Sequence, residues 1–269
     1  MSDSSTILLE ARGISKFYGK VVALDNVSLV VRSGEVTCLL GDNGAGKSTL
    51  IQLLAGVLRP DKGEILSDGR RVEFSSPAQA IDRGIATVFQ DLAVVPIMPV
   101  YRNFVLGRET MTGFGPFKRF DRKAARELTA TALERIGVAV EDVNRPLSTL
   151  SGGERQCVAI ARAVHFGARV LILDEPTSAL GVREAEVVLN YIGHARELGI
   201  GIVLITHNAH HAYPVGDRFV ILRRGSMEGQ FEKSELTAVQ LVRHMAGGAE
   251  LDRLEADLAR NAGEVDAQS

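Results

Sequence analysis

Short apolar runs alternate with helical patterns along most of this chain, and the alternation predicts an open α/β sheet. Four runs are almost continuously hydrophobic, as expected for buried parallel strands: residues 36–40, 85–89, 170–173 and 200–205. Two other regions, 7–31 and 63–74, have the pattern of extended segments with turns. We expect these two regions to form a small antiparallel sheet.

Helical patterns lie between the predicted strands. Ser76 and Pro77 followed by Gly84 fit a helix with proline near its start and glycine past its end. Apolar residues recur at helical spacing in two longer stretches, at Ala125, Leu128, Ala132 and Ile136, and at Val187, Val188, Tyr191, Ile192 and Ala195. These spacings predict two amphipathic helices.

The stretch from about 98 to 166 breaks the alternation, and we expect an inserted helical subdomain there. The whole of residues 1–245 is expected to form one domain. Residues 246–269 are expected to form a C-terminal helix, marked by Leu251, Leu254 and Leu258, and a disordered tail.

Composition limits the classes of protein that the chain can belong to. Its 269 residues are 45% hydrophobic and 24% charged, which suits a substantial buried core. A net charge of −2 argues against a nucleic-acid partner, since such partners favour a basic surface. Cys38 and Cys157 lack metal-binding spacing, and a reducing cytosol is the expected compartment. We see no secretory signal and no apolar run of the roughly 18 residues that span a bilayer, so we expect a soluble protein or one held at a membrane by a partner.

A glycine-rich loop follows the first predicted parallel strand. Its sequence, GDNGAGKST, matches the phosphate-binding pattern G-x-x-x-x-G-K-[ST], with a strand before it and a helix after it. The glycines let backbone N–H groups wrap phosphates, and the helix adds its positive N-terminal end. Lys47 is expected to reach the β- and γ-phosphates, and Ser48 to bind Mg²⁺. The nucleotide is expected to contact the whole loop: Gly41, Asp42, Asn43, Gly44, Ala45, Gly46, Lys47, Ser48 and Thr49.

Chemically useful side chains stand at the ends of the other three parallel strands. Gln90 ends the second strand, and the carboxylates of Asp174 and Glu175 end the third. Thr206 and His207 end the fourth. Ligands of open α/β sheets bind beyond the carboxyl ends of the strands, so these positions predict a single site.

The residue types at this edge indicate roles for each side chain. Asp174 suits a Mg²⁺-linked role, and Glu175 is a candidate to orient or deprotonate an attacking water. Gln90 is a candidate contact for Mg²⁺ and that water, and His207 a candidate contact for the γ-phosphate. Two structural alternatives stay open. In the first, Glu175 is only the N-terminal acid of a helix that begins at Pro176. In the second, His207 is only a core histidine.

A second glycine pair lies in LSGGERQ, residues 150–156. Ser151 and Glu154 have the spacing of a capping box, which predicts a helix start. Gly152 and Gly153 are poor helix formers, and their presence is explained if backbone amides approach a ligand closely. The segment therefore predicts a helix cap that also binds an anion. The alternative is a helix cap alone.

Together these motifs resemble the nucleotide-binding subunits of ATP-binding-cassette (ABC) transporters, over about residues 7–230. GDNGAGKST resembles the Walker A loop, VLILDE (170–175) the Walker B motif, and LSGGERQ the family signature, which other P-loop ATPases lack. Gln90 resembles the Q-loop glutamine and His207 the switch histidine, while Tyr18 stands where an aromatic stacks on adenine.

The resemblance implies an α/β fold, in which a P-loop NTPase core with a mostly parallel sheet carries a small antiparallel β subdomain and the inserted helical subdomain. ATP and Mg²⁺ are the implied cofactors, with Mg²⁺ at Ser48, Gln90 and Asp174. ATP hydrolysis is the implied activity, with Glu175, His207, Lys47 and Gln90 as catalytic residues.

An assembly is implied as well. Cassettes of this family pair head to tail, so that Ser151, Gly152 and Gly153 of one copy cover the ATP on the Walker A loop of the other. ATP closes the pair and hydrolysis releases it, which drives a two-state membrane partner. We therefore expect a second copy, integral-membrane permease subunits and, indirectly, a solute-binding protein as partners. The expected place is the cytoplasmic face of a prokaryotic inner membrane, as a peripheral protein.

Three stretches resemble the monosaccharide-uptake branch (ribose, xylose or fructose type): GDNGAGKST, VYRNFVLGRE (100–109) and DEPTSALGV (174–182). Gly181 stands where most cassettes have an aspartate, a departure familiar in this branch. The single cassette here resembles the unfused form. The main prediction is the ATPase of a sugar importer. The alternatives are a transporter ATPase for another cargo and a soluble cassette ATPase of DNA repair or translation.

The segment LAVVPIMPV, residues 92–100, follows Gln90 closely. Its nine apolar residues include two prolines, which argues against a regular strand. Either it packs inside the helical subdomain, or it forms a docking surface for a cytoplasmic helix of the permease.

Overall fold

A computed structural model describes residues 6–138 and 140–247, and its larger sheet has the strand order β12-β11-β3-β10-β9-β6. Strands β3 (Val36–Leu40), β10 (Gly201–Thr206), β9 (Val170–Asp174), β6 (Ile85–Val88) and β11 (Arg218–Arg223) are parallel, and β12 (Ser226–Glu232) pairs antiparallel with β11. The four predicted parallel strands are confirmed as neighbours, with β6 one residue shorter than expected. The pair β11–β12 was not predicted.

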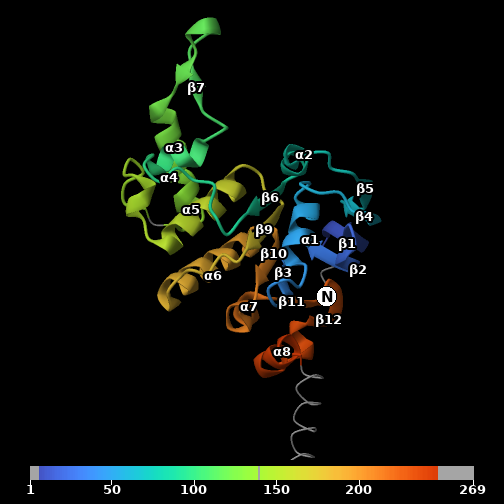
Figure 1. The fold of residues 1–269 in the computed structure, drawn as a ribbon. Helices are drawn as coiled ribbons and strands as arrows, with labels where there is room; N and C mark the ends of the chain where they lie inside the picture. Colours follow the sequence, from blue (N-terminus) through green and yellow to red (C-terminus); the bar gives the residue numbers. More distant parts are fainter. Residues whose placement is uncertain (1–5, 139, 248–269) are drawn as a thin grey trace, which may run out of the picture.

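The predicted antiparallel sheet is also confirmed. It has the order β2-β1-β4-β5, with β1 (Ile7–Tyr18), β2 (Val21–Arg32), β4 (Lys62–Ser67) and β5 (Arg70–Val72) all antiparallel. Figure 1 shows this sheet in blue and teal on one side of the molecule, beyond helix α1 (Lys47–Leu54).

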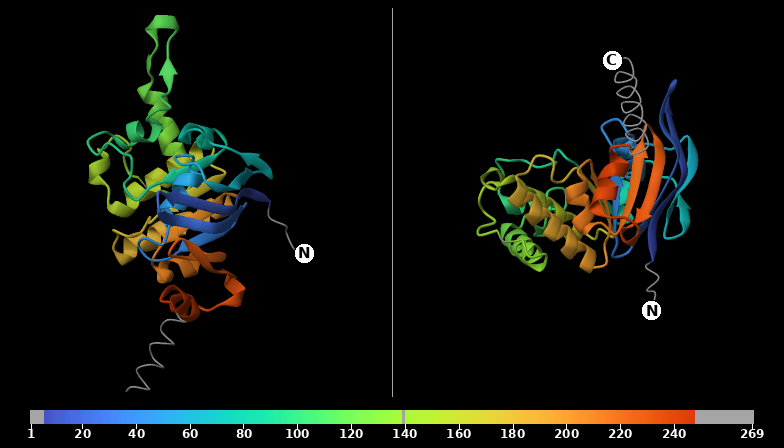
Figure 2. Two further views of the ribbon diagram at one scale, coloured as in Figure 1. Left: turned by 45° about the vertical axis from the view of Figure 1, so that its right-hand side comes forward. Right: turned by 90° about the horizontal axis from the view of Figure 1, so that it is seen from below.

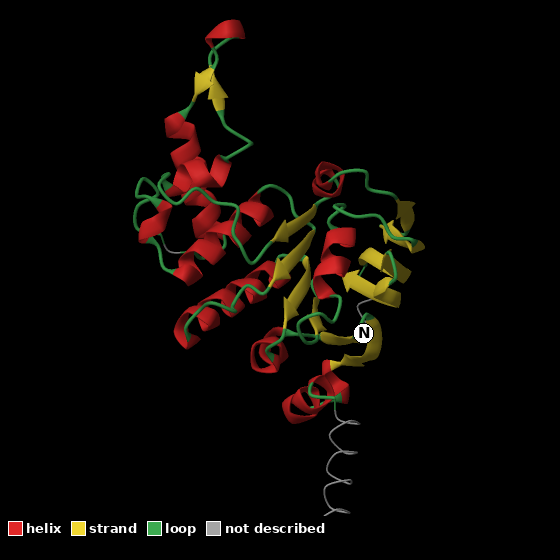
Figure 3. Ribbon diagram, viewed as in Figure 1, coloured by secondary structure: helices red, strands yellow, loops and turns green. Residues whose placement is uncertain are grey.

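Side chains of β3 alternate between two hydrophobic cores. Leu39 belongs to a core shared with α1 and the antiparallel sheet. Cys38 and Leu40 belong to a second core, on the other face. It is shared with α5 (Gly152–His165), α6 (Val182–Glu197), α7 (Ala209–Val215) and α8 (Ala238–Met245). The larger sheet is therefore the middle layer of an α/β sandwich, as Figure 3 shows.

The inserted segment is mostly helical, as expected. It contains α3 (Val100–Val105), α4 (Arg122–Arg135), the 3-10 turn η2 (Leu147–Thr149) and α5. It also contains an unpredicted hairpin of β7 (Met111–Thr112) and β8 (Arg119–Phe120), whose turn is η1 (Gly115–Phe117). Figure 2 shows this hairpin projecting from the body in green. The boundaries 1–245 and 98–166 stay predictions.

Two short elements complete the described chain, α2 (Pro77–Asp82) and η3 (Lys233–Glu235). Helix α2 begins at the proline that predicted it, and α4 and α6 coincide with the two longer predicted helices. The C-terminal helix expected at Leu251, Leu254 and Leu258 lies outside the described residues. In the part of the chain that the structure describes, no helix has the length and apolarity to cross a membrane.

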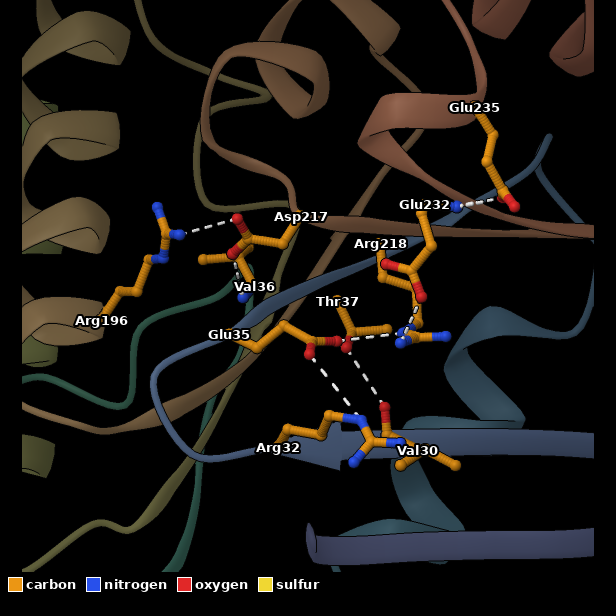
Figure 4. A network of polar contacts seen from close by, with 10 residues as sticks. All are labelled: Val30, Arg32, Glu35, Val36, Thr37, Arg196, Asp217, Arg218, Glu232 and Glu235. Atoms are coloured by element: carbon orange, nitrogen blue, oxygen red, sulfur yellow. Dashed lines mark hydrogen bonds and ion pairs between the residues drawn. The ribbon is translucent and has the colours of Figure 1, made fainter. Parts of the chain in front are cut away.

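A network of ion pairs fixes the amino ends of the parallel strands (Figure 4). Asp217 accepts a hydrogen bond from the backbone N–H that begins β3, at 2.9 Å, and pairs with Arg196 of α6 at 2.8 Å. Arg218 pairs with Glu35 at 3.0 Å and with Glu232 at 2.5 Å. Because the Arg218 side chain is mostly buried, these pairs are screened less than surface pairs. The network holds the end of the sheet opposite the predicted site.

Candidate functional site

The glycine-rich loop joins β3 to α1, and its backbone favours glycine at three positions. Gly41, Gly44 and Gly46 have φ angles of 147°, 83° and 106°, which other residues rarely adopt. A Cβ atom at Gly41 would collide with the carbonyl oxygen of Leu222 in β11. One at Gly46 would lie 2.7 Å from the carbonyl oxygen of Ala23 in β2. The loop therefore packs closely against β11 of the larger sheet and β2 of the antiparallel sheet.

Lys47 begins α1, and its ammonium group points back into the loop. Its Nζ donates hydrogen bonds to the carbonyl oxygens of Gly41 (2.5 Å) and Asp42 (3.1 Å). Burial lowers the pKa of Lys47, and the carboxylates of Glu175 and Asp174 oppose that shift. A buried ammonium held by neutral carbonyls gains from an anionic ligand, so this position suits a phosphate.

Asp174 and Glu175 leave the sheet together at the end of β9. Burial raises the pKa of Asp174, the nearby charge of Glu175 adds to the rise, and Lys47 opposes it. Glu175 has a φ of 49°, a left-handed conformation uncommon outside glycine. Its N–H donates to the carbonyl of Ile205 at 3.0 Å, which ties this turn to β10. The two carboxylates are thus held in a partly dehydrated, negatively charged site.

His207 contacts Glu175 directly. Its Nδ1 lies 2.8 Å from Glu175 Oε1, and the side chains are 55% and 12% exposed respectively. Glu175 Oε2 is buried with no hydrogen-bond partner among the described residues, a costly arrangement that a ligand or water would relieve. The alternative of His207 as a core histidine is wrong, since its ring is exposed. The helix-acid alternative for Glu175 is also wrong, because Pro176 begins a turn and not a helix.

Gln90 and Tyr18 lie at the margin of this arrangement. Gln90 is exposed and follows β6, the neighbour of β9, so it lies at the same edge of the sheet. Tyr18 ends β1 and is also exposed. Its strand partner Val21 begins β2, the strand that touches the glycine-rich loop. No hydrogen bond or ion pair between described residues joins either side chain to Lys47, and their roles toward a ligand stay predictions.

The helix cap predicted in LSGGERQ is confirmed. Ser151 Oγ accepts from the N–H of Glu154 at 3.2 Å, and Glu154 Oε2 accepts from the N–H of Ser151 at 2.6 Å. Both halves of the capping box are therefore present at the start of α5.

The two glycines after the cap also have a packing role that the sequence analysis did not foresee. A Cβ atom on Gly152 would lie 2.6 Å from Leu180, and one on Gly153 would lie 3.1 Å from Glu184 Cβ. The glycines thus let α5 approach the start of α6. These contacts are to the following turn and helix of the same chain, and none is to the glycine-rich loop.

Two further polar contacts position the segments around the site and were not predicted. Buried Asn103 accepts from the N–H of Val95 at 2.7 Å and donates to the carbonyls of Val95 and Met98 at 3.0 and 3.1 Å. It holds residues 92–99, which form no regular strand, as predicted. His211 Nδ1 lies 2.9 Å from Thr177 Oγ1 and ties the turn after Glu175 to α7. For the first of these contacts, the asparagine in VYRNFV (100–105) was the one signal in the sequence.

An apolar cavity of about 230 Å³ lies between β6, the segment after Gln90 and α5. Its walls include Phe89, Leu92 and Val94 on one side and Val158 on the other. Lys47, Asp174, Glu175 and His207 do not line it. The cavity is therefore separate from the strand-end site, and it adjoins the segment expected to pack or to dock.

Comparison with known proteins gives consistent relatives. The family model described as "ABC transporter" matches residues 24–178. The chain is 42% identical to a xylose/arabinose import ATP-binding protein of Sulfolobus acidocaldarius, covering 90% of this chain and 95% of that protein. It is 41% identical to a fructose import ATP-binding protein of Rhizobium meliloti, covering 91% and 96%. It is also similar to a solved dimeric ATP-binding cassette in a post-hydrolysis state with ADP and Pi, at 26% identity and a TM-score of 0.69, covering 84% and 99%.

Proposed function

This chain belongs to the ABC transporter family, and from that membership we propose that it is the ATP-hydrolysing subunit of a monosaccharide importer. Cassettes of this family bind ATP and hydrolyse it to power transport. The sugar class rests on the relatives, whose names specify import of xylose or arabinose and of fructose. A transporter ATPase for another cargo would have the same ATP site, and a soluble cassette ATPase would lack the membrane partner.

The residues of the site fit both ATP and Mg²⁺. Lys47 is proposed to contact the β- and γ-phosphates, because its buried ammonium group points into the phosphate loop. Ser48, Gln90 and Asp174 offer oxygen atoms, which Mg²⁺ prefers, and the burial that raises the pKa of Asp174 would be offset by a cation. Within residues 6–138 and 140–247, no group of three or more His, Cys, Asp or Glu side chains is arranged to hold a metal alone. Phosphate oxygens would complete the coordination, and bound Mg²⁺ would neutralise developing charge on the phosphates.

Hydrolysis is assigned to Glu175 with His207. Glu175 Oε1 is engaged by His207 Nδ1, so the unpaired Oε2 is the atom that accepts a proton from the attacking water. The second ring nitrogen of His207 remains for a γ-phosphate oxygen. Glu175 has low exposure, which strengthens its interactions with His207 and with the water, because electrostatic forces grow as water is excluded.

Each ATP site is completed by a second copy of the chain. The carrying observation is the start of α5, where the capping box of Ser151 and Glu154 surrounds Gly152 and Gly153, and the nearest neighbours of these glycines among the described residues belong to Leu180 and Glu184, not to the phosphate loop. A capped helix start binds anions. A head-to-tail dimer would place Ser151, Gly152 and Gly153 against ATP on the partner's loop and Lys47. The dimeric state of the similar cassette supports this arrangement.

We assign the docking site of the membrane partner to the apolar cavity. Phe89, Leu92 and Val94 line it beside exposed Ile97, in a segment that Asn103 holds in place. An apolar surface of this kind is typical of a protein-interaction site. A cytoplasmic helix of an integral-membrane permease is the proposed occupant. The chain would then be a peripheral protein on the cytoplasmic face of a prokaryotic membrane, served by a separate solute-binding protein.

The composite site is tested by Ser151→Arg. We expect the variant to bind ATP as a monomer but not to dimerise, because the longer cation would occupy the space of the partner's phosphates. Light scattering with ATP and Mg²⁺, in a Glu175→Gln background, measures the dimer. Ser234→Arg, in exposed η3, is the matched control. Normal dimers of Ser151→Arg would refute the composite site.

The sugar class is tested in cells. A Lys47→Ala chromosomal variant is expected to lose uptake of a labelled pentose or hexose and to keep uptake of amino acids. Unchanged uptake of every monosaccharide tried would remove the sugar assignment and leave the ATPase assignment intact.

A further inference from the structure

The hairpin β7–β8 carries aromatic side chains away from the core. Phe114 and Phe117, at its tip, are 91% and 83% exposed. Figures 1 and 2 show the tip projecting beyond the rest of the molecule in different views. Only two residue pairs form the ladder, Met111 with Phe120 and Thr112 with Arg119. So small a sheet cannot bury the tip residues, and their exposure opposes the usual burial of large apolar groups.

The tip is shaped as a turn rather than as loose chain. Gly113 and Gly115 have φ angles of 99° and 55°, in the left-handed region. The N–H of Phe117 donates to the carbonyl of Phe114 at 3.1 Å, and a Cβ atom on Gly113 would lie 2.5 Å from the Phe117 carbonyl oxygen. The two phenyl side chains are therefore presented on a compact 3-10 turn.

The base of the hairpin is anchored on the helices beneath it. Phe120 stacks on Tyr101 of α3, with ring centroids 6.3 Å apart and planes 7° apart. Arg102 lies over the Phe120 ring at 5.3 Å. The N–H of Asp121 donates to the carbonyl of Thr110 at 2.8 Å. The projecting turn thus has a fixed direction relative to the domain.

Basic residues flank the aromatic tip, in a chain whose net charge is −2. Residues 110–120 contain no Asp or Glu, and Lys118 and Arg119 follow the tip directly. Arg122 and Lys123 then occupy the first turn of α4, where positive charge opposes the helix dipole. Of the acids at its base, Asp121 caps α4 through the N–H of Ala124 at 2.9 Å, Glu127 lies 3.9 Å from Lys123, and Glu109 precedes the hairpin. The hairpin therefore presents two exposed phenyl groups next to a cluster of basic side chains, which we call its cationic base.

We propose that this hairpin seats on an anionic membrane surface, with Phe114 and Phe117 at the boundary of headgroups and acyl chains. Lys118 and Arg119 would then lie near lipid phosphates. The proposal rests on the proposed function in one respect, that the chain works at a membrane. A protein occupant is disfavoured by size, because a stable interface buries about 800 Å² on each partner, more than a six-residue turn offers. The hairpin would fix the orientation of the cassette beside its permease.

A single fluorescent reporter tests the proposal, because the chain contains no tryptophan. Phe117→Trp places the reporter at the tip, and Val239→Trp, at a 79% exposed position of α8, is the matched control. Each full-length variant is mixed with vesicles of phosphatidylcholine and phosphatidylglycerol, without nucleotide. We expect the emission of Phe117→Trp to shift to shorter wavelength and to be quenched by brominated acyl chains. Val239→Trp should do neither.

Charge reversal tests the cationic base. In the Phe117→Trp background, Lys118→Glu with Arg119→Glu should weaken vesicle binding about 30-fold or more, since each basic residue changes it about fivefold. Arg70→Glu with Arg71→Glu, the same charge change on β5, should leave binding within about twofold.

Two results would overturn the proposal. One is the absence of any response of Phe117→Trp to vesicles, and the other is equal responses of the two reporters. Either would show that the hairpin does not seat on the membrane, and a protein partner would then be the alternative to test. ATP-dependent dimerisation of the same variants, measured without vesicles, tests the proposed function separately.

Discussion

Replacing Glu175 by glutamine tests the assigned base with little change in shape. Glu175 Oε1 lies 2.8 Å from His207 Nδ1, and Oε2 is buried without a partner in the described chain. Glutamine retains an oxygen or amide group opposite His207, but neither accepts a proton from water. We expect ATP to bind and the dimer to form, while hydrolysis slows.

The expected loss is about 10²–10⁴-fold, the usual contribution of a general base. It corresponds to about 2.7–5.4 kcal/mol of transition-state stabilisation. ATP affinity should stay the same or rise, because the variant removes one negative charge from a site that already contains Asp174. The charge of Glu175 contributes to the raised pKa of Asp174, so the substitution should lower the Asp174 pKa as well.

Single-turnover hydrolysis of labelled ATP, with protein in excess, isolates the chemical step from product release. Filter binding measures the affinity. Glu186→Gln, an exposed position of α6, is the control for loss of a carboxylate. A single-turnover rate for Glu175→Gln within about threefold of the wild type would refute the assignment, since a base contributes far more.

Four further substitutions test other parts of the account. Asp174→Asn should raise the free energy of unfolding of the nucleotide-free chain at neutral pH, because a raised pKa makes ionisation of the folded state costly as pH rises. Urea titrations should show the gain vanishing at a pH low enough to protonate Asp174 in both states. Gly41→Ala should abolish ATP binding, since its Cβ would meet the Leu222 carbonyl. Gly44→Ala would place a Cβ with no atom within 4 Å. It should lower the free energy of unfolding, measured by urea titration, by only about 1–2 kcal/mol of backbone strain. Asn103→Ala should lower stability by about 2–3 kcal/mol by thermal or urea unfolding, because several partly buried backbone groups lose their partner. A loss below about 0.5 kcal/mol would contradict this role.

Sequence patterns predicted the parts of the fold that bury both faces of a strand. The runs at β3, β6, β9 and β10 are almost continuously apolar because helices or a second sheet cover each side. Strands β11 and β12 escaped prediction, since arginines bracket the run of β11 and its pairing with β3 joins distant parts of the chain. The hairpin β7–β8 has two-residue strands, which are too short for any periodicity. Its position depends on tertiary contacts such as Phe120 with Tyr101 of α3, which join distant parts of the chain and leave no local pattern.

Strand-end positions placed Glu175 and His207 at one edge, but their contact was not predictable. It depends on side-chain direction, which the left-handed φ of Glu175 sets. Likewise, the sequence indicated why Gly152 and Gly153 would suit a ligand. Their packing against Leu180 required knowing that α5 and α6 lie side by side.

The central claim is that each ATP site combines Lys47 of one copy with Ser151 of another. A mixture of Lys47→Ala and Ser151→Arg chains tests this most directly. Each variant alone should be inactive, because both sites of its dimer are damaged. In a mixed dimer, one site would contain both substitutions and the other neither. We predict that mixing restores ATP hydrolysis, to about one quarter of the wild-type rate if the chains pair at random and to about one half if only mixed dimers form, for independent sites. If the mixture stays as inactive as its components, the site is not shared between copies and the account is contradicted.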